Sequence, residues 1–394
     1  MSNPDSSNSP PRVVVWGTYD SGKPRVRILL AGLRSQGARI IECRSDVWGG
    51  IEDKSQIRGP GRKLKLLVRW LFSYPGLVFR YLRLPAHDLV LVCYMGQLDV
   101  LVLKPFARLR GVPILWDAFL SLYDTAVNDR KIVGRKNPLA WFLYAWEWLA
   151  CRAASRVLLD TEAHAEYFRR EFRLRPARTA AVFVGAEPDS FPGIPVAGRA
   201  GSQGRPSRKK ELHVLFYGQF IPLHGIETII SAASLLAEEP VYWTIIGQGQ
   251  EAERIAEIVK REKLKKLDWR PWVPYKKLAE MIGRADACLG IFGGSGKASR
   301  VIPNKAFQIL MVGKPLITRD SAAIRELLRP EMPGVYLIPP EDPFTLAATL
   351  RGLLKHPVKP PRGGFHKGIR PRLLPDAIGA ELLVIMENML REQE

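Results

Sequence analysis

Residues 213–233 read HVLFYGQFIPLHGIETIISAA and predict a strand, a glycine turn and a helix in direct succession. The strand is an apolar run rich in aromatic and β-branched residues, and it turns at Gly218. Apolar residues at helical spacing follow Gly225. A second apolar run, VYWTIIG at 241–247, comes after the helix. Strand, helix and strand in this order form a parallel pair with a right-handed crossover, so we expect an α/β architecture.

The same alternation extends in both directions along the chain. Two further strand-like runs follow, DACLGIF at 286–292 and KPLITR at 314–319. The first half contains six such runs: RVVVW, ARIIEC, DLVLVCY, VPILW, SRVLLD and TAAVFV, at 12–16, 38–43, 88–94, 112–116, 155–160 and 179–184. Because 394 residues exceed one typical core, we expect two Rossmann-like domains, each with its own parallel sheet.

The expected boundary between the domains is a segment rich in Gly, Pro, Ser and Arg. It reads GIPVAGRAGSQGRPSRKK from Gly193 and contains few apolar residues, which is typical of a linker or a mobile loop. We therefore predict a linker at 192–211. This places an N-terminal domain at 12–191, a C-terminal domain at 212–372 and a final amphipathic helix within 373–394.

Composition limits the class of protein. Apolar residues make up 46% and charged residues 25%, as in ordinary globular proteins. The four cysteines, Cys43, Cys93, Cys151 and Cys288, lie far apart, which argues against a zinc site or a disulfide framework and favours a reducing cytoplasm. The polar N-terminus lacks the apolar core of a signal peptide, and the most apolar stretches are too short to span a membrane.

The net charge of +20, with a pI near 9.9, is the unusual property of the composition. Such a field favours anionic partners, namely nucleotide diphosphates, nucleic acid or the acidic inner leaflet of a membrane. No RNP-like, helix-turn-helix or zinc-finger pattern supports nucleic-acid binding. The turn at Gly17 does not read G-x-G-x-x-G, so the NAD fingerprint is absent. We therefore expect no nucleic-acid partner.

The run GIFGGSGKASRVIPNKAFQILMVGKPLITRDSAAIRE, at 290–326, presents three cations beside glycines. Lys297, Arg300 and Lys305 lie within nine positions, and Pro303 marks the expected start of a helix. Backbone N–H groups and the helix dipole add to the side-chain charge, so this arrangement favours a diphosphate ligand. The alternative is a solvated basic turn before an ordinary core helix.

The pattern PNK…GKP, followed by Asp-Ser and a helix ending in Arg-Glu-Leu, resembles the donor-sugar segment of family 4 glycosyltransferases. The resemblance implies the GT-B fold, in which two Rossmann-like domains face each other across a cleft. It also implies retaining transfer of a sugar from a nucleotide-sugar donor to a glycan or lipid-linked acceptor, in cell-surface polysaccharide or glycolipid synthesis and without a cofactor. In that fold the final helix commonly crosses back to the N-terminal domain.

Several positions depart from the pattern of that family. Many relatives carry two glutamates separated by seven residues, where this chain has Arg300 and Gln308. Gln308 offers a ribose a neutral amide, and Arg300 offers a phosphate its guanidinium. The Arg and Lys that touch the donor diphosphate in relatives are Gln219 and His224 here. A His at a strand end of the N-terminal domain is replaced by Trp116, so catalysis is not assigned to it.

The candidate site residues form two sets. The donor-binding candidates are Gly17, Gly218, Gln219, His224, Gly247, Gly249, Lys297, Arg300, Lys305 and Gln308. In the N-terminal half, Arg25 opens a helix as a ligand for the acceptor or a phosphate. Asp117, at a strand end, is the candidate catalytic carboxylate that orients the acceptor hydroxyl or stabilises positive charge at the sugar. Asp124, Asp129 and Arg130 are weaker candidates, which an internal ion-pair loop would explain equally well.

The sequence contains no Asp-x-Asp pair, the metal-binding motif of the other large class of glycosyltransferases. We therefore expect metal-independent transfer, in which Lys297, Arg300 and Lys305 hold the charge that develops on the departing diphosphate. Two alternatives stay open. One is a nucleotide-sugar epimerase of the same fold, and the other is a non-catalytic subunit that binds a nucleotide sugar or a polysaccharide.

Two aromatic segments carry different expectations. Residues 61–84, GRKLKLLVRWLFSYPGLVFRYLRL, alternate cations with large apolar side chains, as surfaces that bind anionic membranes do. A core-packed helix with basic side chains in solvent is the alternative. Residues 138–152, PLAWFLYAWEWLACR, are more aromatic and less charged, and we expect them in the core. The chain is thus expected to be cytoplasmic and peripheral on the inner face of the plasma membrane.

Overall fold

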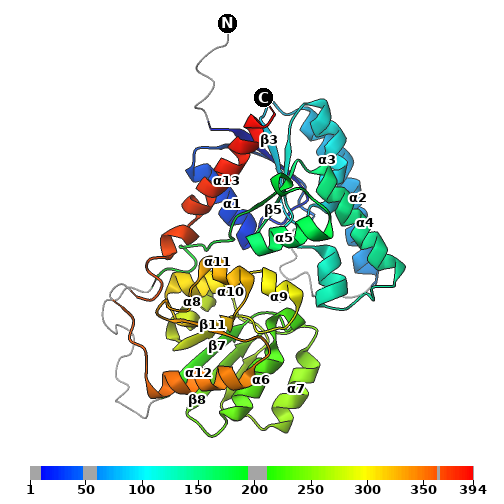
Figure 1. The fold of residues 1–394 in the computed structure, drawn as a ribbon. Helices are drawn as coiled ribbons and strands as arrows, with labels where there is room; N and C mark the ends of the chain where they lie inside the picture. The colour runs from blue at the N-terminus through cyan, green and yellow to red at the C-terminus, as the bar shows by residue number, and fades with distance from the viewer. Residues whose placement is uncertain (1–9, 48–59, 194–210, 362–363, 394) are drawn as a thin grey trace. The chain divides into compact units, whose positions relative to one another are not determined.

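The computed structural model describes residues 10–47, 60–193, 211–361 and 364–393, and two compact units make up the chain. The first comprises Met1–Val127, Ile132–Gly185 and Leu374–Glu394, and the second Asn128–Lys131 and Ala186–Leu373. Each unit contains one six-stranded sheet in which all pairs are parallel (Figure 1). The predicted α/β architecture with two Rossmann-like domains is confirmed.

The first unit has the strand order β2-β1-β3-β4-β5-β6. Its strands are β1 (Arg12–Gly17), β2 (Arg39–Arg44), β3 (Leu89–Val92), β4 (Ile114–Asp117), β5 (Arg156–Leu159) and β6 (Thr179–Ala181). Its helices are α1 (Pro24–Ser35), α2 (Pro60–Leu82), α3 (Gln97–Leu109), α4 (Pro138–Ala153), α5 (Glu162–Glu171) and α13 (Pro375–Arg391). Strands β3, β4 and β5 are buried along their whole length, which is why their segments read as apolar runs.

Helices cover both faces of this sheet. One core cluster joins the strands to α2, α3, α4 and α5. On the other face, α13 packs against α1 at two glycines. A Cβ on Gly32 would lie 2.2 Å from the carbonyl oxygen of Pro375 and 2.7 Å from the amide nitrogen of Gly379. The last helix of the chain therefore completes the first unit through a backbone contact that only glycine permits.

The second unit has the strand order β12-β11-β10-β7-β8-β9. Its strands are β7 (Leu212–Tyr217), β8 (Val241–Ile246), β9 (Leu267–Arg270), β10 (Ala287–Leu289), β11 (Leu316–Arg319) and β12 (Val335–Ile338). Its helices are α6 (Ile226–Leu235), α7 (Ala252–Arg261), α8 (Tyr275–Arg284), α9 (Gly296–Arg300), α10 (Asn304–Val312), α11 (Ala322–Leu327) and α12 (Pro343–Lys355). A separate core cluster fills this unit.

The sequence predicted the inner strands of the second unit and missed both edges. Strand β9, LDWR, alternates half-buried and exposed positions, and β12 lies at the opposite edge. The half-buried edge strand β9 therefore lacks the apolar run that identifies a strand, whereas β12, VYLI, is itself a short apolar run.

The boundary between the two units falls at Gly185/Ala186, before the predicted linker. Most of that linker, residues 194–210, lies outside the described residues.

The expectation that residues 138–152 belong to the core is wrong for the outer face of this helix. Helix α4 turns small residues such as Ala140, Ala150 and Cys151 inward. Trp141 is 72% and Phe142 58% exposed. Composition alone does not tell which face of a helix is covered, because inward positions with small residues let the helix approach the sheet closely.

Candidate functional site

The glycine turn after β7 brings a histidine and a lysine together. Gly218 has φ +149°, and a Cβ there would lie 2.8 Å from the Nζ of Lys305 and 2.8 Å from the Cε1 of His224. Only glycine fits this position, both for its backbone conformation and for the space that remains. The structure thus places Gly218, His224 and Lys305, three of the predicted donor-binding residues, at one point.

Lys305 is a buried cation without an acidic partner. It lies in the first turn of α10, and its side chain is 5% exposed. Its Nζ lies 3.4 Å from the carbonyl oxygen of Gly290 and 3.9 Å from the ring centroid of Phe216. Among the described residues no carboxylate contacts it, and burial lowers the pKa of its ammonium well below the ordinary value. A bound diphosphate would supply the missing negative charge.

His224 is neutral in this arrangement. Its Nδ1 donates a hydrogen bond to the carbonyl oxygen of Gln219, so in the neutral ring Nε2 is an acceptor. Burial and the charge of Lys305 hold the pKa of His224 well below its usual range. The imidazole would therefore donate to a phosphate only after the phosphate has raised its pKa.

The loop before α9 is fixed by side chains from neighbouring strand ends. Arg319, the last residue of β11, donates to the carbonyl oxygens of Gly293 and Ser295. Glu341, beyond β12, accepts a hydrogen bond from the backbone N–H of Gly294 (3.1 Å). Ser295 caps α9 by accepting from the N–H of Ala298 (3.2 Å). These contacts define where the glycines of the loop lie.

Lys297 and Arg300 lie on α9, the short helix that this loop opens. The side chain of Lys297 is buried. Arg300 folds back toward the loop, since a Cβ on Gly296 would lie 2.9 Å from its NH1 nitrogen. The two cations are thus carried by the same short element, between the glycine loop and the start of α10.

Gln308 belongs to a chain of hydrogen bonds that the sequence did not predict. Its Oε1 accepts from the hydroxyl of Tyr217 (2.8 Å), and its Nε2 donates to the hydroxyl of Tyr275 (3.2 Å). Tyr275 in turn donates to a carboxylate oxygen of Glu187 (2.9 Å). These contacts fix the orientation of the amide, and one N–H and one lone pair keep no partner among the described residues.

The remaining glycines and Gln219 complete the surroundings of the turn. Gly247 and Gly249 both have φ +154°, and a Cβ on Gly247 would lie 1.9 Å from the carbonyl oxygen of Gly218. They therefore support the turn at Gly218 through backbone packing. The side chain of Gln219 is exposed. Asp129, within the part of the chain grouped with this unit, accepts a hydrogen bond from Ser295 (2.8 Å).

In the first unit, Gly17 is the last residue of β1 and packs against the buried carboxylate of Asp99. A Cβ on Gly17 (φ +129°) would lie 2.5 Å from the Oδ2 of Asp99. Asp99 accepts from the backbone N–H of Thr18 (3.0 Å) and from the hydroxyl of Tyr74 (2.7 Å). Burial raises the pKa of Asp99 to about 6, although these hydrogen bonds oppose the rise. Asp99 of α3 thus fixes the turn after Gly17 through its hydrogen bond from Thr18.

Arg25 and Asp117, the predicted phosphate ligand and the predicted catalytic carboxylate, form a buried ion pair. Nε of Arg25 lies 2.8 Å from Oδ1 and 3.0 Å from Oδ2 of Asp117. The remaining nitrogens of Arg25 donate to the carbonyl oxygens of Val182 and Leu159. Both side chains are fully buried, so neither has a surface to offer a ligand here. The ion pair joins α1 to the end of β4, and the roles of the two residues toward a ligand stay predictions.

Other buried polar groups of this unit serve the fold. Glu147 of α4 accepts from Ser121 (2.6 Å) and from the backbone N–H of Leu122 (3.0 Å), and burial raises its pKa to about 7. His164 pairs with Asp160 at 2.7 Å. The i to i+4 spacing of this pair on a helix start was the available sequence signal.

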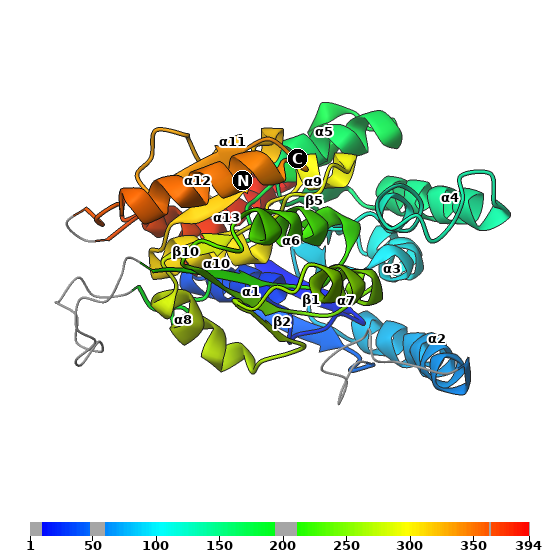
Figure 2. The same ribbon diagram turned by 90° about the horizontal axis from the view of Figure 1, so that it is seen from below.

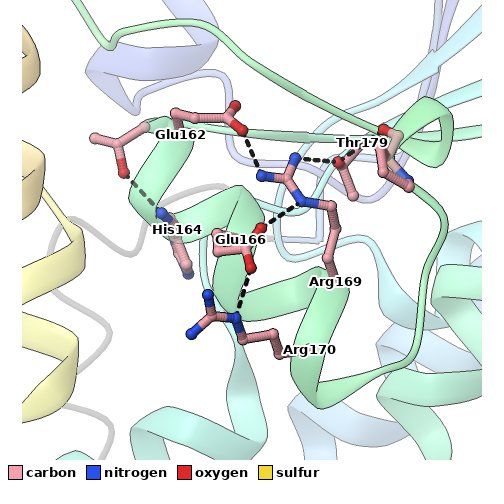
Figure 3. Close-up of polar contacts among 8 residues, drawn as sticks. Glu162, His164, Glu166, Arg169, Arg170 and Thr179 are labelled. Carbon is pink, nitrogen blue, oxygen red and sulfur yellow. Dashed lines mark hydrogen bonds and ion pairs between the residues drawn. The ribbon is translucent and has the colours of Figure 1, made fainter.

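Helix α5 is held in place by an arginine network. Figure 3 shows Arg169 between Glu162 and Glu166, with a further hydrogen bond to Thr179 at the start of β6 (3.0 Å). Arg170 also pairs with Glu166 (2.5 Å). Most of these side chains are on the surface, so the network positions α5 more than it stabilises the fold.

Comparisons with known proteins agree with this geometry. Residues 211–356 match the family model described as Glycosyl transferases group 1. A curated relative from Escherichia coli (strain K12), WcaI, named as a colanic acid biosynthesis glycosyl transferase, is 29% identical over 146 residues. That match spans 36% of this chain and 36% of the relative.

Solved structures match over nearly the whole chain. Anabaena Alr3699/HepE, solved with UDP, gives a TM-score of 0.64 at 12% identity and covers 96% of this chain and 100% of its own. The lipopolysaccharide outer core galactosyltransferase WaaB gives 0.63 at 14% identity, with coverages of 96% and 99%. Sucrose-phosphate synthase of Thermosynechococcus elongatus gives 0.64 at 16%, with coverages of 98% and 97%. At these identities the likeness concerns the fold.

The two parallel sheets with their helices therefore have the GT-B fold of glycosyltransferases. The family model falls on the second unit, where Gly218, His224 and Lys305 meet. The PNK…GKP segment lies within the residues that match Glycosyl transferases group 1, so this part of the chain is similar to glycosyltransferases, as its resemblance predicted.

Proposed function

We propose that the chain transfers a sugar from a nucleotide-sugar donor to a glycan or lipid-linked acceptor in the synthesis of a cell-surface polysaccharide or glycolipid. The curated relative is named for colanic acid biosynthesis, and one structural neighbour is a lipopolysaccharide galactosyltransferase. Another neighbour was solved with UDP and with UDP-glucose. These names support a nucleotide-sugar donor and a glycan product.

The observation that carries this proposal is the buried ammonium of Lys305. A lysine in an apolar setting without a counter-charge costs stability, so its presence needs a compensating function. It faces Gly218, whose missing side chain lets a ligand approach the backbone, at the N-terminus of α10. Cation, glycine and helix dipole at one point fit a diphosphate.

The mechanism follows from charge placement. Cleavage of the bond to the sugar leaves negative charge on the departing diphosphate. Lys305 would hold this charge from α10, and Lys297 and Arg300 would add theirs from α9. Because these groups are positioned before the reaction, they stabilise the transition state without reorganisation. We propose on this basis that transfer proceeds without a metal ion and, from the family resemblance, with retention of configuration.

Gln308 would bind the ribose. Its amide is held by Tyr217 and Tyr275, so one N–H and one lone pair point in fixed directions. Together they match the donor and acceptor character of a ribose hydroxyl. Position 308 carries a neutral amide in place of a ribose-binding carboxylate, and Tyr275 links this amide to Glu187.

The first test is thermal denaturation of the purified protein with UDP, other nucleoside diphosphates and their sugars. Binding to the native state raises stability by about 2.7 kcal/mol at a ligand concentration of a hundred times Kd. We expect a selective rise with one nucleoside diphosphate that is lost in Lys305→Ala. Lys276→Ala, which alters an exposed lysine of α8, is the matched control and keeps the rise. A rise of wild-type size in Lys305→Ala contradicts the proposed site.

A second candidate function is a non-catalytic subunit that binds a nucleotide sugar or polysaccharide. The burial of Asp117 against Arg25 and the Trp at position 116 favour it, because the first unit lacks an exposed carboxylate or imidazole at the end of β4. Incubation with the donor that stabilises the protein separates the two. Release of the nucleoside diphosphate in the presence of a glycan or lipid-linked acceptor supports transfer, and binding without release supports the subunit.

We also propose that the protein works in the cytoplasm on the inner face of the plasma membrane. In the part of the chain that the structure describes, no helix has the length and apolarity needed to cross a bilayer. The net charge of +20 favours an anionic surface. Cell fractionation, with and without a high-salt wash of the membranes, tests this localisation.

A further inference from the structure

Helix α4 exposes aromatic side chains that the fold does not use. Trp141 is 72% exposed and Phe142 58%, and Leu139 beside them is also exposed. The rings of Trp146 and Phe142 lie 5.6 Å apart by their centroids, so the aromatic residues form a continuous group. Ordinary surfaces carry isolated apolar residues, whereas a group of this kind marks an interaction site.

Along the chain, cations precede this group and no acidic residue interrupts it. Arg135 and Lys136 are exposed immediately before the helix. The first acidic residue after them is Glu147, which is buried and engaged by Ser121 and the backbone of Leu122. The exposed aromatic residues of the first half of α4 thus follow two exposed cations, with no carboxylate in the described chain from Lys131 to Trp146.

Helix α2 presents the same chemistry. Its inner face carries Tyr74, Leu77 and Tyr81, which pack in the core. For this face, the alternative of a core-packed helix holds. The other face exposes Phe72 (80%), together with Leu64, Leu67, Val68, Leu71 and Phe79. The sequence of residues 61–84 contains six Arg or Lys and no Asp or Glu. An all-cationic border around exposed apolar side chains is complementary to anionic lipid headgroups above an acyl layer.

The two helices belong to one layer of the first unit. Helices α2, α3 and α4 cover the same face of the sheet in one core cluster, and α3 packs against both of its neighbours. Figure 2 shows the three helices side by side. At the end of α3, Leu109 adds another exposed apolar side chain, next to the exposed Arg108.

We propose that this layer is a membrane-docking face, in which Trp141 and Phe142 of α4 and Phe72 of α2 insert into an anionic bilayer. Aromatic side chains favour the headgroup region, where their apolar rings leave water and their edges stay near polar groups. The surrounding Arg and Lys side chains bind the headgroups. Docking needs neither donor nor acceptor, so it does not rest on the proposed transfer reaction.

The test is co-sedimentation of the full chain with phosphatidylcholine vesicles, with and without phosphatidylglycerol. We expect binding only to the anionic vesicles and a decrease with salt. The double variant Trp141→Ser/Phe142→Ser should weaken binding at least about tenfold, because two side chains lose apolar burial in the bilayer. Phe344→Ala, which removes an aromatic of 72% exposure on α12, is the matched control and binds as wild type.

Three outcomes would overturn the proposal. These are no vesicle binding by the wild type, equal binding to neutral vesicles, and wild-type binding by the Trp141/Phe142 variant. Sedimentation velocity without lipid tests a second copy of the chain as the occupant. A concentration-dependent dimer that the double variant abolishes, with vesicle binding unchanged, would assign this face to self-association. In differential scanning calorimetry, an unchanged transition of the unit that carries the substitution, the first unit for Trp141/Phe142 and the second for Phe344, shows that each variant is folded.

Discussion

At the scale of single residues, Lys305 is expected to lower the stability of the unliganded protein and to strengthen nucleotide binding. Its ammonium is buried without a carboxylate partner in the described chain, so it lowers stability in the absence of ligand. Lys305→Met keeps most of the volume and removes the charge. We expect this variant to be more stable than wild type by about 1–3 kcal/mol without nucleotide, and to gain nothing when nucleotide is added. Urea denaturation with and without the nucleotide measures both. A destabilised Lys305→Met would show that the ammonium has a structural partner.

The lowered pKa of Lys305 also predicts how binding depends on pH. Burial depresses the pKa in the unliganded protein, and a bound diphosphate raises it again, so binding takes up a proton. Affinity is therefore constant below the depressed pKa and falls about tenfold per pH unit as the pH rises through it. Measurements above about pH 7 avoid titration of the phosphate itself.

Lys305→Arg is the control for this titration, because a guanidinium stays charged throughout that range. We expect the variant to bind with little dependence on pH, whatever its absolute affinity. Isothermal titration calorimetry in buffers of different ionisation enthalpy would detect the proton directly. An equal loss of affinity with pH in both proteins would assign the titration to another group.

The sequence indicated which residues lie near the candidate site better than it indicated what each of them contacts. The glycine turn, the histidine and the lysine were readable because local rules place a turn before one helix and a cation at the start of another. Burial is not a local property. Arg25 and Asp117 had the types and positions of ligands, and only the packed structure shows that they neutralise each other. The chain from Gln308 through Tyr275 to Glu187 joins three segments and has no sequence signal.

At the scale of elements, the contact between α1 and α13 is the most specific one. A Cβ on Gly32 would lie 2.2 Å from the backbone oxygen of Pro375, and neither backbone can move without displacing a helix. Gly32→Ala should therefore destabilise the protein by at least about 2 kcal/mol, against its favourable helix propensity. Gly352→Ala, on α12 with open space around it, is the control and should stabilise by up to about 1 kcal/mol. Equal effects of the two would mean that α13 does not pack as described.

Elements were predictable where burial is complete. The central strands are covered on both sides and read as apolar runs, whereas the edge strand β9 carries a mixed pattern and was missed. The other edge strand, β12, was missed although it reads VYLI. Helices α2 and α4 show the limit for helical segments. Their aromatic content is similar, yet α2 buries Tyr74 and Tyr81 while α4 buries Ala140 and Ala150. The sequence shows that a helix is apolar, and only packing selects its inner face.

The molecule as a whole consists of two units with separate cores, one around β1–β6 and one around β7–β12. Each sheet and its helices bury their own apolar residues, so we expect two transitions in differential scanning calorimetry. The candidate nucleotide site lies in the second unit and the glycine contact of α1 and α13 in the first. Nucleotide should raise only one transition, and Gly32→Ala should lower only the other. If both perturbations moved the same transition, the two units would unfold as one cooperative body.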